Sequence, residues 1–239
     1  MIRDYEISRV EEISSFYLHH QLNIDDVILE LRFRTIMPWL RGLSCLELGP
    51  GNGQHLPSLL EIFEQVTILD GSKALLENIR VESAKLEKIH TLFEDFSTDQ
   101  KFDCIIADHV LEHVEEPQAI LVQIKKWLAP GGRVIIGVPN ANSLHRLAAV
   151  KMGILASQHD LNERDEILGH RRVYSRDQLQ EEIENAGLRV SHMLGVFLKP
   201  LSNQQIEAVF SNAMISGFYE LGKEFPEIAA EIYAICQTG

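Results

Sequence analysis

Short hydrophobic runs alternate along this chain with stretches in which apolar residues return every three or four positions. The runs are rich in Ile, Val and Leu and are typical of buried strands. They lie at residues 44–49, 65–70, 89–93, 103–108, 132–138 and 188–198. The stretches between them have the period of helices with one apolar face, as Leu56, Leu59 and Phe63 illustrate. This alternation predicts an α/β fold that is doubly wound, with a mostly parallel sheet and helices on both faces.

Both flanks of the alternating region are expected to be helical. Asn23 followed by acidic residues is typical of a helix start, and residues 1–42 predict an N-terminal helical segment that covers a sheet edge or a cofactor. Residues 202–236 predict two helices broken near Pro226, and nothing there has the pattern of a seventh strand. We expect a single domain over 1–239, divided into this N-terminal segment, a core at 43–139, and a region at 140–239 with an insert, the sixth strand and C-terminal helices.

Composition and charge narrow the classes of function. The 239 residues are 45% hydrophobic, and 22 basic against 35 acidic residues give a formal net charge of −13. Such an acidic chain without a dense Lys/Arg cluster is not expected to bind nucleic acid. No apolar run approaches the roughly 18 residues that span a bilayer, so no membrane partner is expected and the cytoplasm is the predicted location. Cys45, Cys104 and Cys236 lack metal-type spacing and are predicted to be reduced thiols.

The most informative segment is the glycine-rich turn after the first predicted strand. Gly49, Gly51 and Gly53 lack a Cβ atom, so the backbone can turn tightly with positive φ and approach a ligand closely. Glu47 lies at the end of the strand, where its carboxylate could meet a cation. In the dinucleotide fingerprint the third glycine stands one position later, where this chain has Gln54, so a nicotinamide cofactor fits less well.

Further motifs follow this turn in order. A second strand ends in Asp70-Gly71-Ser72, a third in Glu94-Asp95-Phe96, a fourth in Asp108-His109, and Leu128–Pro139 supplies a turn and a fifth strand. The ordered set resembles the class I S-adenosylmethionine-dependent methyltransferases over roughly residues 40–140, with weaker likeness through Leu198. The resemblance implies a Rossmann-like sheet and S-adenosyl-L-methionine as the cofactor.

For the amino-acid and ribose parts of that cofactor, the resemblance implies three contacts. Glu47 would accept hydrogen bonds from the ammonium, and amides of the glycine turn would approach the amino-acid portion. Asp70, beside Gly71 and Ser72, would accept both ribose hydroxyls. Glu47 as an isolated buried acid and Asp70 as a helix cap are the structural alternatives.

For the adenine and the methionine end, the resemblance implies contacts from the third and fourth strands. Asp95 would accept from the adenine amino group, and Phe96 would offer its backbone N–H to the ring. Asp108 or His109 would lie at the methionine end. A solvated turn is the alternative for Asp95, and a cap of the following helix is the alternative for Asp108.

Acceptor chemistry is expected from the insert that follows the fifth strand. Methyl transfer from a sulfonium needs mainly alignment and desolvation, and a nearby histidine could take the acceptor's proton. His170 and His145 are the catalytic candidates, with a solvated loop histidine as the alternative for each. Arg171 and Arg172 are either surface charges or hold an acidic or phosphorylated acceptor. Weaker pocket candidates are Tyr17, His20, Tyr174 and Lys199.

A metal site is the alternative interpretation of the residues after the fourth strand. His109 and His113 are four residues apart with Glu112 beside them, so one helix face could carry them as ligands. The favoured interpretation has no metal, because His109 stands where metal-binding members of the resembled family have an acid.

The predicted function is therefore transfer of a methyl group to an oxygen or nitrogen of a small metabolite, with a sugar or secondary-metabolite intermediate suggested by resemblance alone. The alternatives are a noncatalytic cofactor-binding regulatory or assembly subunit and, less favoured, a nicotinamide-dependent oxidoreductase. The expected partner is a small-molecule acceptor, and a homodimer is left open.

Overall fold

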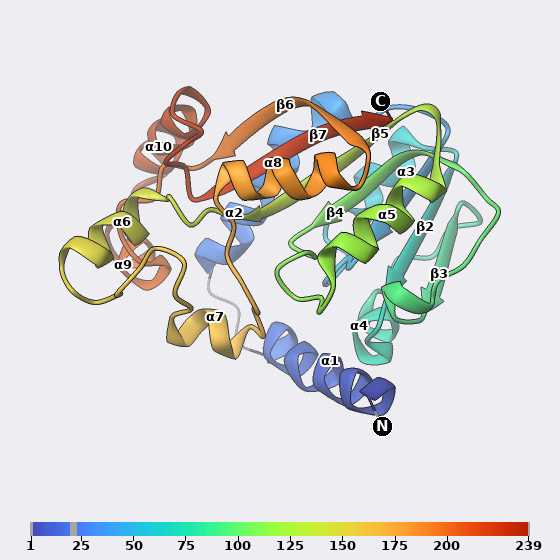
Figure 1. Ribbon diagram of the computed structural model, residues 1–239, viewed down its shortest axis with the longest axis horizontal. Coiled ribbons are helices and arrows are strands. Elements are labelled where there is room, and N and C mark those ends of the chain that lie inside the picture. The colour runs from blue at the N-terminus through green and yellow to red at the C-terminus, as the bar shows by residue number, and fades with distance from the viewer. Residues whose placement is uncertain (1, 20–22, 239) are drawn as a thin grey trace.

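One seven-stranded sheet organises the computed structural model, which describes residues 2–19 and 23–238. Its order is β3-β2-β1-β4-β5-β7-β6, and β7 alone runs antiparallel to its two neighbours (Figure 1). The strands are β1 Ser44–Leu48, β2 Gln65–Asp70, β3 Leu86–His90, β4 Phe102–Asp108, β5 Leu128–Pro139, β6 Leu188–Val196 and β7 Glu231–Thr238. The predicted doubly wound, mostly parallel α/β fold is confirmed.

Alternating side chains along the central strands build a core on each face of the sheet. Ile105 and Ala107 of β4 belong to one cluster of buried residues, and Cys104 and Ile106 belong to the other. Both neighbours in sequence are buried because helices cover both faces, which is why these strands read as continuous apolar runs. Because neither face of these strands is polar, their sequence does not show which side chains point to which face of the sheet.

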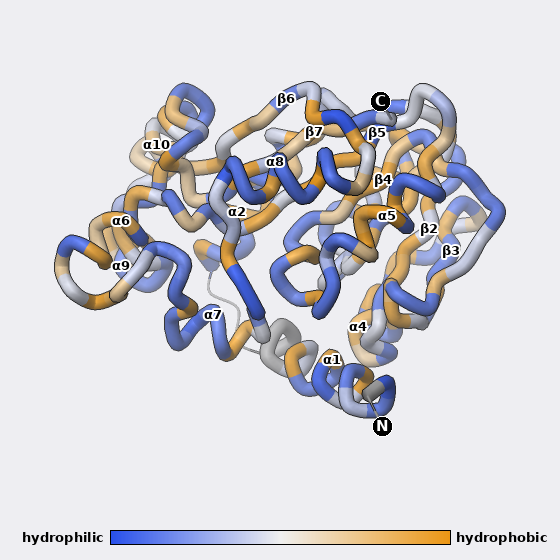
Figure 2. The backbone as a smooth tube through the Cα atoms, viewed as in Figure 1, coloured by the Kyte–Doolittle hydropathy of each residue, from blue (hydrophilic) through white to orange (hydrophobic). Residues whose placement is uncertain are grey.

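The helices flank this sheet. They are α1 Ile2–His19, α2 Asn23–Ile36, α3 Leu56–Ile62, α4 Lys73–Asn78, α5 Pro117–Trp127, α6 Leu144–Lys151, α7 Glu163–Ile167, α8 Arg176–Asn185, α9 Asn203–Val209 and α10 Asn212–Glu224, with short 3-10 helices η1 Met37–Trp39 and η2 Phe93–Asp95. Figure 2 shows hydrophilic and hydrophobic stretches alternating along α5 and α8, as expected of helices that present one apolar face to a sheet. Among the described residues, no helix combines the length and hydropathy needed to cross a membrane.

The C-terminal region corrects the sequence prediction. Helices α9 and α10 occupy its first part, but the residues after Pro226 form β7 rather than continuing as helix. β7 pairs with β5 over Val134–Pro139 and with β6 over Leu188–Val196, so its backbone groups are satisfied on both edges. Ala and Glu within this segment favour a helix locally, whereas burial between two strands favours the extended form. The seventh strand is thus present although its local sequence signal is weak.

Candidate active site

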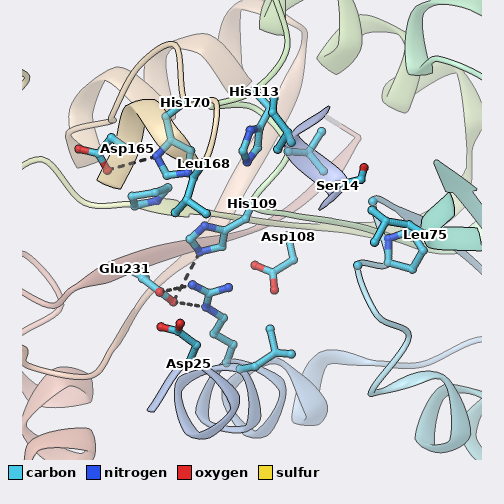
Figure 3. Close-up of a pocket in the computed structure, with 18 of the residues that line it drawn as sticks. Ser14, Asp25, Leu75, Asp108, His109, His113, Asp165, Leu168, His170 and Glu231 are labelled. Carbon is cyan, nitrogen blue, oxygen red and sulfur yellow. Dashed lines mark hydrogen bonds and ion pairs between the residues drawn. The ribbon is translucent and has the colours of Figure 1, made fainter. Parts of the chain in front are cut away.

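A cavity of about 420 Å³ lies at the carboxyl ends of β1, β2 and β4. This is the edge at which open parallel sheets bind ligands. One side is lined by the glycine turn and residues after β2, and the other by side chains of α2, α6, α7 and the start of β7. Figure 3 places Leu75 on one side of the cavity and Asp25, Asp165 and Glu231 on the other, with Asp108 and His109 between them.

The glycine turn has the conformation that the sequence predicts. Gly49, Gly51 and Gly53 have φ of +65°, +56° and +73°, a region in which side chains are strained. A Cβ atom on Gly51 would meet no protein atom within 4 Å, whereas one on Gly53 would lie 2.9 Å from Ile79. Gly53 is therefore required for packing, and Gly51 leaves open space beside the cavity for a ligand.

Glu47 lines the cavity from β1. Burial, with a smaller contribution from Asp108, raises the pKa of its carboxyl to about 8. Such a group is largely protonated at neutral pH, and an incoming cation would favour its ionised form. This is suitable chemistry for holding an ammonium group.

Asp70 and Gly71 also line the cavity, at the end of β2. Asp70 is buried and accepts a 2.7 Å hydrogen bond from the Ser72 backbone N–H. Burial raises its pKa to about 6, although that hydrogen bond opposes the shift. The cap of α4 is Ser72, whose Oγ accepts from the Leu75 N–H, so Asp70 is not the cap. Ser72 itself does not line the cavity.

The adenine contacts predicted from the third motif are not brought to the cavity. Asp95 is 3.1 Å from Arg3, and Phe96 packs edge-on against Trp127 with ring centroids 5.0 Å apart. The 3-10 helix η2 instead turns Glu94 toward the cavity, and burial raises the pKa of its carboxyl. In a run of adjacent acids, only the local backbone decides which one faces inward.

A buried charge network lies at the end of β4 (Figure 3). His109 has a left-handed backbone, and its Nδ1 lies 2.8 Å from Glu112. Its Nε2 lies 3.6 Å from Glu231, which also makes a bidentate pair with Arg32 of α2. Burial and Arg32 lower the pKa of His109, but Glu112 and Glu231 outweigh them and raise it to about 10. His109 is therefore a cation at neutral pH.

Asp108 lines the cavity beside this network. Its Oδ1 accepts a hydrogen bond from the Tyr233 hydroxyl of β7. The contact links the fourth strand to the seventh across β5. The position of the Asp108 side chain is therefore fixed by a strand far away in the sequence. Asp108 does not cap a helix, because the residues that follow β4 form turns.

The two candidate bases both reach the cavity. His170 lies against His113, with ring centroids 4.8 Å apart, and its Nδ1 is 3.3 Å from Asp165. This carboxylate can fix the orientation of the ring. The pKa of His145 is lowered to about 3, mainly by burial and then by the positive charge of Lys199. The Nδ1 atom of His145 is buried without a hydrogen-bond partner.

The arginines of the insert have structural partners. Arg171 pairs with Glu6 at 2.6 Å and donates to the His113 carbonyl, and Arg172 donates to three carbonyls of the loop before α5. The Tyr174 hydroxyl donates to Glu182, away from the cavity. Of the weaker candidates, Lys199 lines the cavity. The side chain of Tyr17 and all of His20 lie outside the described residues.

The histidines after β4 do not share a helix face. Residues 109–116 form turns because the backbone turns sharply at His109. The structure instead brings Glu112, His113 and His170 together, with one potential ligand atom from each within 4.8 Å of the others. Glu112 already contacts the His109 cation, which neutralises much of the negative charge that a metal would need.

Helix α1 closes the cavity on one side, with side chains that were not among the candidates from the sequence. Glu6, Arg9 and Val10 line the cavity, and Arg9 donates to the Gly169 carbonyl. Glu11 accepts from Ser72 Oγ at 2.9 Å and from the Lys73 N–H at 2.7 Å. Apolar residues of α1 do not form a single stripe, so the pattern alone gave little sign of this docking.

This fold, with a glycine turn and acidic strand ends around one cavity, defines the class of S-adenosylmethionine-dependent methyltransferases. A family model described as a methyltransferase domain matches residues 17–193, well over half of the chain, and the chain therefore belongs to that family. The resemblance seen in the sequence is confirmed, as is S-adenosylmethionine as the cofactor of the family.

The chain is also similar to known proteins in sequence and, more distantly, in fold. The chain is 33% identical over 110 residues to an uncharacterized 37.1 kDa protein in a transposon of Streptomyces fradiae, covering 43% of this chain and 32% of that protein. It is 29% identical over 162 residues to the ubiquinone biosynthesis O-methyltransferase of Vibrio atlanticus, covering 61% and 66%. The match thus spans from about a third to two thirds of these relatives. The N-methyltransferase NodS of Bradyrhizobium japonicum, solved with S-adenosyl-L-homocysteine, has a similar fold, with a TM-score of 0.59, 14% identity, and coverage of 98% and 97%.

Proposed function

We propose that this protein transfers the methyl group of S-adenosylmethionine to an oxygen or nitrogen of a small molecule. The observation that carries the proposal is a single cavity that joins the glycine turn, Glu47 and Asp70 to two histidines, His145 and His170. An oxygen acceptor is favoured by the likeness to ubiquinone biosynthesis O-methyltransferases. A sugar or secondary-metabolite acceptor, a cytoplasmic location, a homodimer and the absence of nucleic-acid binding stay predictions.

The residues of the cavity fit this cofactor. Glu47 offers a carboxyl to an ammonium, and Gly51 leaves room for close approach of the backbone. Asp70 offers a carboxylate to a diol, and Gly71 lies beside it. The cofactor supplies a methyl group activated by a sulfonium, which needs no metal or strong acid to depart. Asp95 and Phe96 stay predictions for the adenine, and Glu94 is the acid at that side of the cavity.

On the acceptor side, His170 is the proposed proton acceptor. Asp165 lies 3.3 Å from its Nδ1, so the orientation of the ring is fixed with Nε2 free to face the acceptor. Residues of α1 and α7 line the same part of the cavity, so they would help to hold an acceptor in line with the methyl group.

The test is calorimetry with S-adenosylmethionine and with NAD, followed by an assay for acceptor-dependent S-adenosylhomocysteine. We expect binding of the first ligand and turnover with a subset of hydroxyl or amine compounds. Binding of NAD instead would contradict the proposal. Cofactor binding without turnover across broad acceptor panels would favour a regulatory subunit.

A further inference from the structure

Charged side chains crowd the side of the cavity that is away from the ribose-binding strand end (Figure 3). We name this side the acceptor recess. It comprises Asp25, Arg32, His109, His145, Arg146, Arg164, Asp165, Lys199, Asn203 and Glu231. The recess belongs to an acidic chain of net charge −13, so any local excess of cations calls for a physical explanation.

Four of the cations in the acceptor recess have carboxylate partners. Each partner lies within direct contact, so these charges are largely neutralised inside the protein. The pairs are Arg32 with Glu231 at 2.6 Å, His109 with Glu112 at 2.8 Å, Arg146 with Asp165 at 2.9 Å, and Arg164 with Asp25 at 2.8 Å.

Lys199 is different. Within the part of the chain that the structure describes, its ammonium makes no hydrogen bond and no ion pair, although it lines the cavity. Burial lowers its pKa to about 8, and the nearest carboxylates are already engaged by arginines. A group of this kind is still mainly charged at neutral pH. Enclosed cations without a partner are costly, and they are found where a ligand supplies the missing charge.

Other polar atoms of the acceptor recess also lack hydrogen bonds. They are Asn203 Oδ1, His145 Nδ1 and His109 Nε2, the last lying 3.6 Å from Glu231, while the Asn203 amide nitrogen donates to Asp25. Most buried polar atoms in proteins are satisfied, so unpaired atoms on one wall of a cavity indicate a place for a polar ligand. The amide oxygen of Asn203 accepts hydrogen bonds and fits a donor of that ligand, whereas the Lys199 ammonium repels metal ions and fits an anionic group.

We infer that the methyl acceptor carries an anionic group, a carboxylate or a phosphate, and that Lys199 binds it. This inference rests on the proposed function and narrows its substrate class. The hydroxyl or amine that receives the methyl group then lies toward His145 and His170, while the anionic end lies toward Lys199. A neutral acceptor would leave the Lys199 ammonium without a direct partner.

The inferred anion has a second consequence, for His145. Lys199, Arg146 and burial lower the pKa of His145, against the opposing effect of Asp165 and Glu231. An anion on Lys199 would cancel much of its repulsion and raise the proton affinity of His145. The proton affinity of His145 would therefore rise only when a charged acceptor is bound, and a neutral analogue would leave it unchanged.

The first experiment uses small probes, because the acceptor is unidentified. The protein is saturated with S-adenosylhomocysteine at constant ionic strength, and the acylation rates of Lys199 and of exposed Lys73 are followed by mass spectrometry. The probes are benzoate, inorganic phosphate and neutral benzamide. We expect benzoate or phosphate to slow the labelling of Lys199 several-fold and to leave Lys73 unchanged, and the more effective anion identifies the group. No protection by either anion, or equal protection by benzamide, would overturn the inference.

The second experiment compares acceptors. Hydroxy acids and amino acids are each assayed beside their neutral amides for production of S-adenosylhomocysteine. Lys199→Met should raise KM for the acid about tenfold or more, the loss expected for one charge-assisted hydrogen bond, with the larger effect on KM than on kcat. Lys199→Arg should recover part of it, and Lys73→Met is the surface control. Better turnover of the amides would contradict the inference.

Cofactor binding separates the two proposals. Lys199→Met should bind S-adenosylhomocysteine as the unmodified protein does, since Lys199 lies in the acceptor recess. Failure of the unmodified protein to bind it would refute the proposed function. Normal cofactor binding without any effect of anions on Lys199 would refute the anionic acceptor alone.

Discussion

Replacing Asp70 with Asn should move cofactor affinity and stability in opposite directions. The carboxylate is buried at the end of β2, and burial raises its pKa to about 6 against an ordinary value of 3.8. A native acid with a raised pKa binds more protons than the unfolded chain between pH 4 and 6, so its effect on stability becomes unfavourable as pH rises through that range. At neutral pH, the ionised group therefore destabilises the ligand-free protein.

The magnitude follows from the shift. A change of about two pKa units corresponds to about 3 kcal/mol at 1.36 kcal/mol per unit. Asn is neutral and can still accept from the Ser72 N–H, so Asp70→Asn should stabilise the ligand-free protein by about 1 to 3 kcal/mol, or several degrees in Tm. Its affinity for S-adenosylmethionine should fall by about 1.5 to 3 kcal/mol, the loss expected for hydrogen bonds to a charged acceptor.

The assay combines calorimetry with thermal unfolding at pH 5 and pH 7. The unmodified protein should gain more cofactor affinity between these values than Asp70→Asn, because the ribose acceptor ionises only in the unmodified protein, whereas ionisation of Glu47 raises the affinity in both. Asp103→Asn is the matched control. Asp103 accepts from the Leu43 and Ser44 N–H groups, which lower its pKa, so this variant should lose stability and keep its cofactor affinity. Unchanged affinity in Asp70→Asn would refute the ribose role, and a lower Tm would refute the argument from burial.

Three further outcomes test the site. Gly51→Val should nearly abolish cofactor binding measured by calorimetry, because the added side chain fills space for the ligand rather than space within the protein. Circular dichroism should show that the variant is folded, and normal binding by it would remove the glycine turn from the site. His170→Ala should slow single turnover by about 10² to 10⁴ with little change in cofactor affinity, whereas an effect of His145→Ala alone would transfer the role of base to that residue. Chelation with EDTA should leave turnover within about twofold, because the His109 cation neutralises Glu112; a large loss restored by a divalent cation would show that the cluster with His113 holds a metal.

The parts of the site that sequence predicted are those set by local backbone. A glycine turn after a buried strand requires positive φ, and the structure has it at Gly49, Gly51 and Gly53. Asp70 is the last residue of its strand, so its place at the sheet edge could also be predicted. Glu94 was missed because neighbouring acids differ only in the rotation of a 3-10 turn.

Contacts between residues far apart in the chain could not be predicted from the sequence. Arg32 and Glu231 form the central ion pair of the acceptor recess across 199 positions, and neither belongs to a motif. The seventh strand was missed for the same reason, since its residues become extended only when β5 and β6 flank them. Docking of α1 depends on polar contacts of Glu11 with Ser72 and Lys73 rather than on an apolar stripe.

The place of β7 also sets an order of events during biosynthesis. β7 follows β6 in the chain but lies between β5 and β6 in the sheet, so among the described strands β6 has no neighbour until β7 has been made. Pairing of β7 with β5 is a non-local step, and such steps are intrinsically slow. The same pairing brings Glu231 to Arg32 and His109, and Tyr233 to Asp108. A nascent chain can thus form its glycine turn early, but it acquires a complete acceptor recess only when the sheet itself is finished.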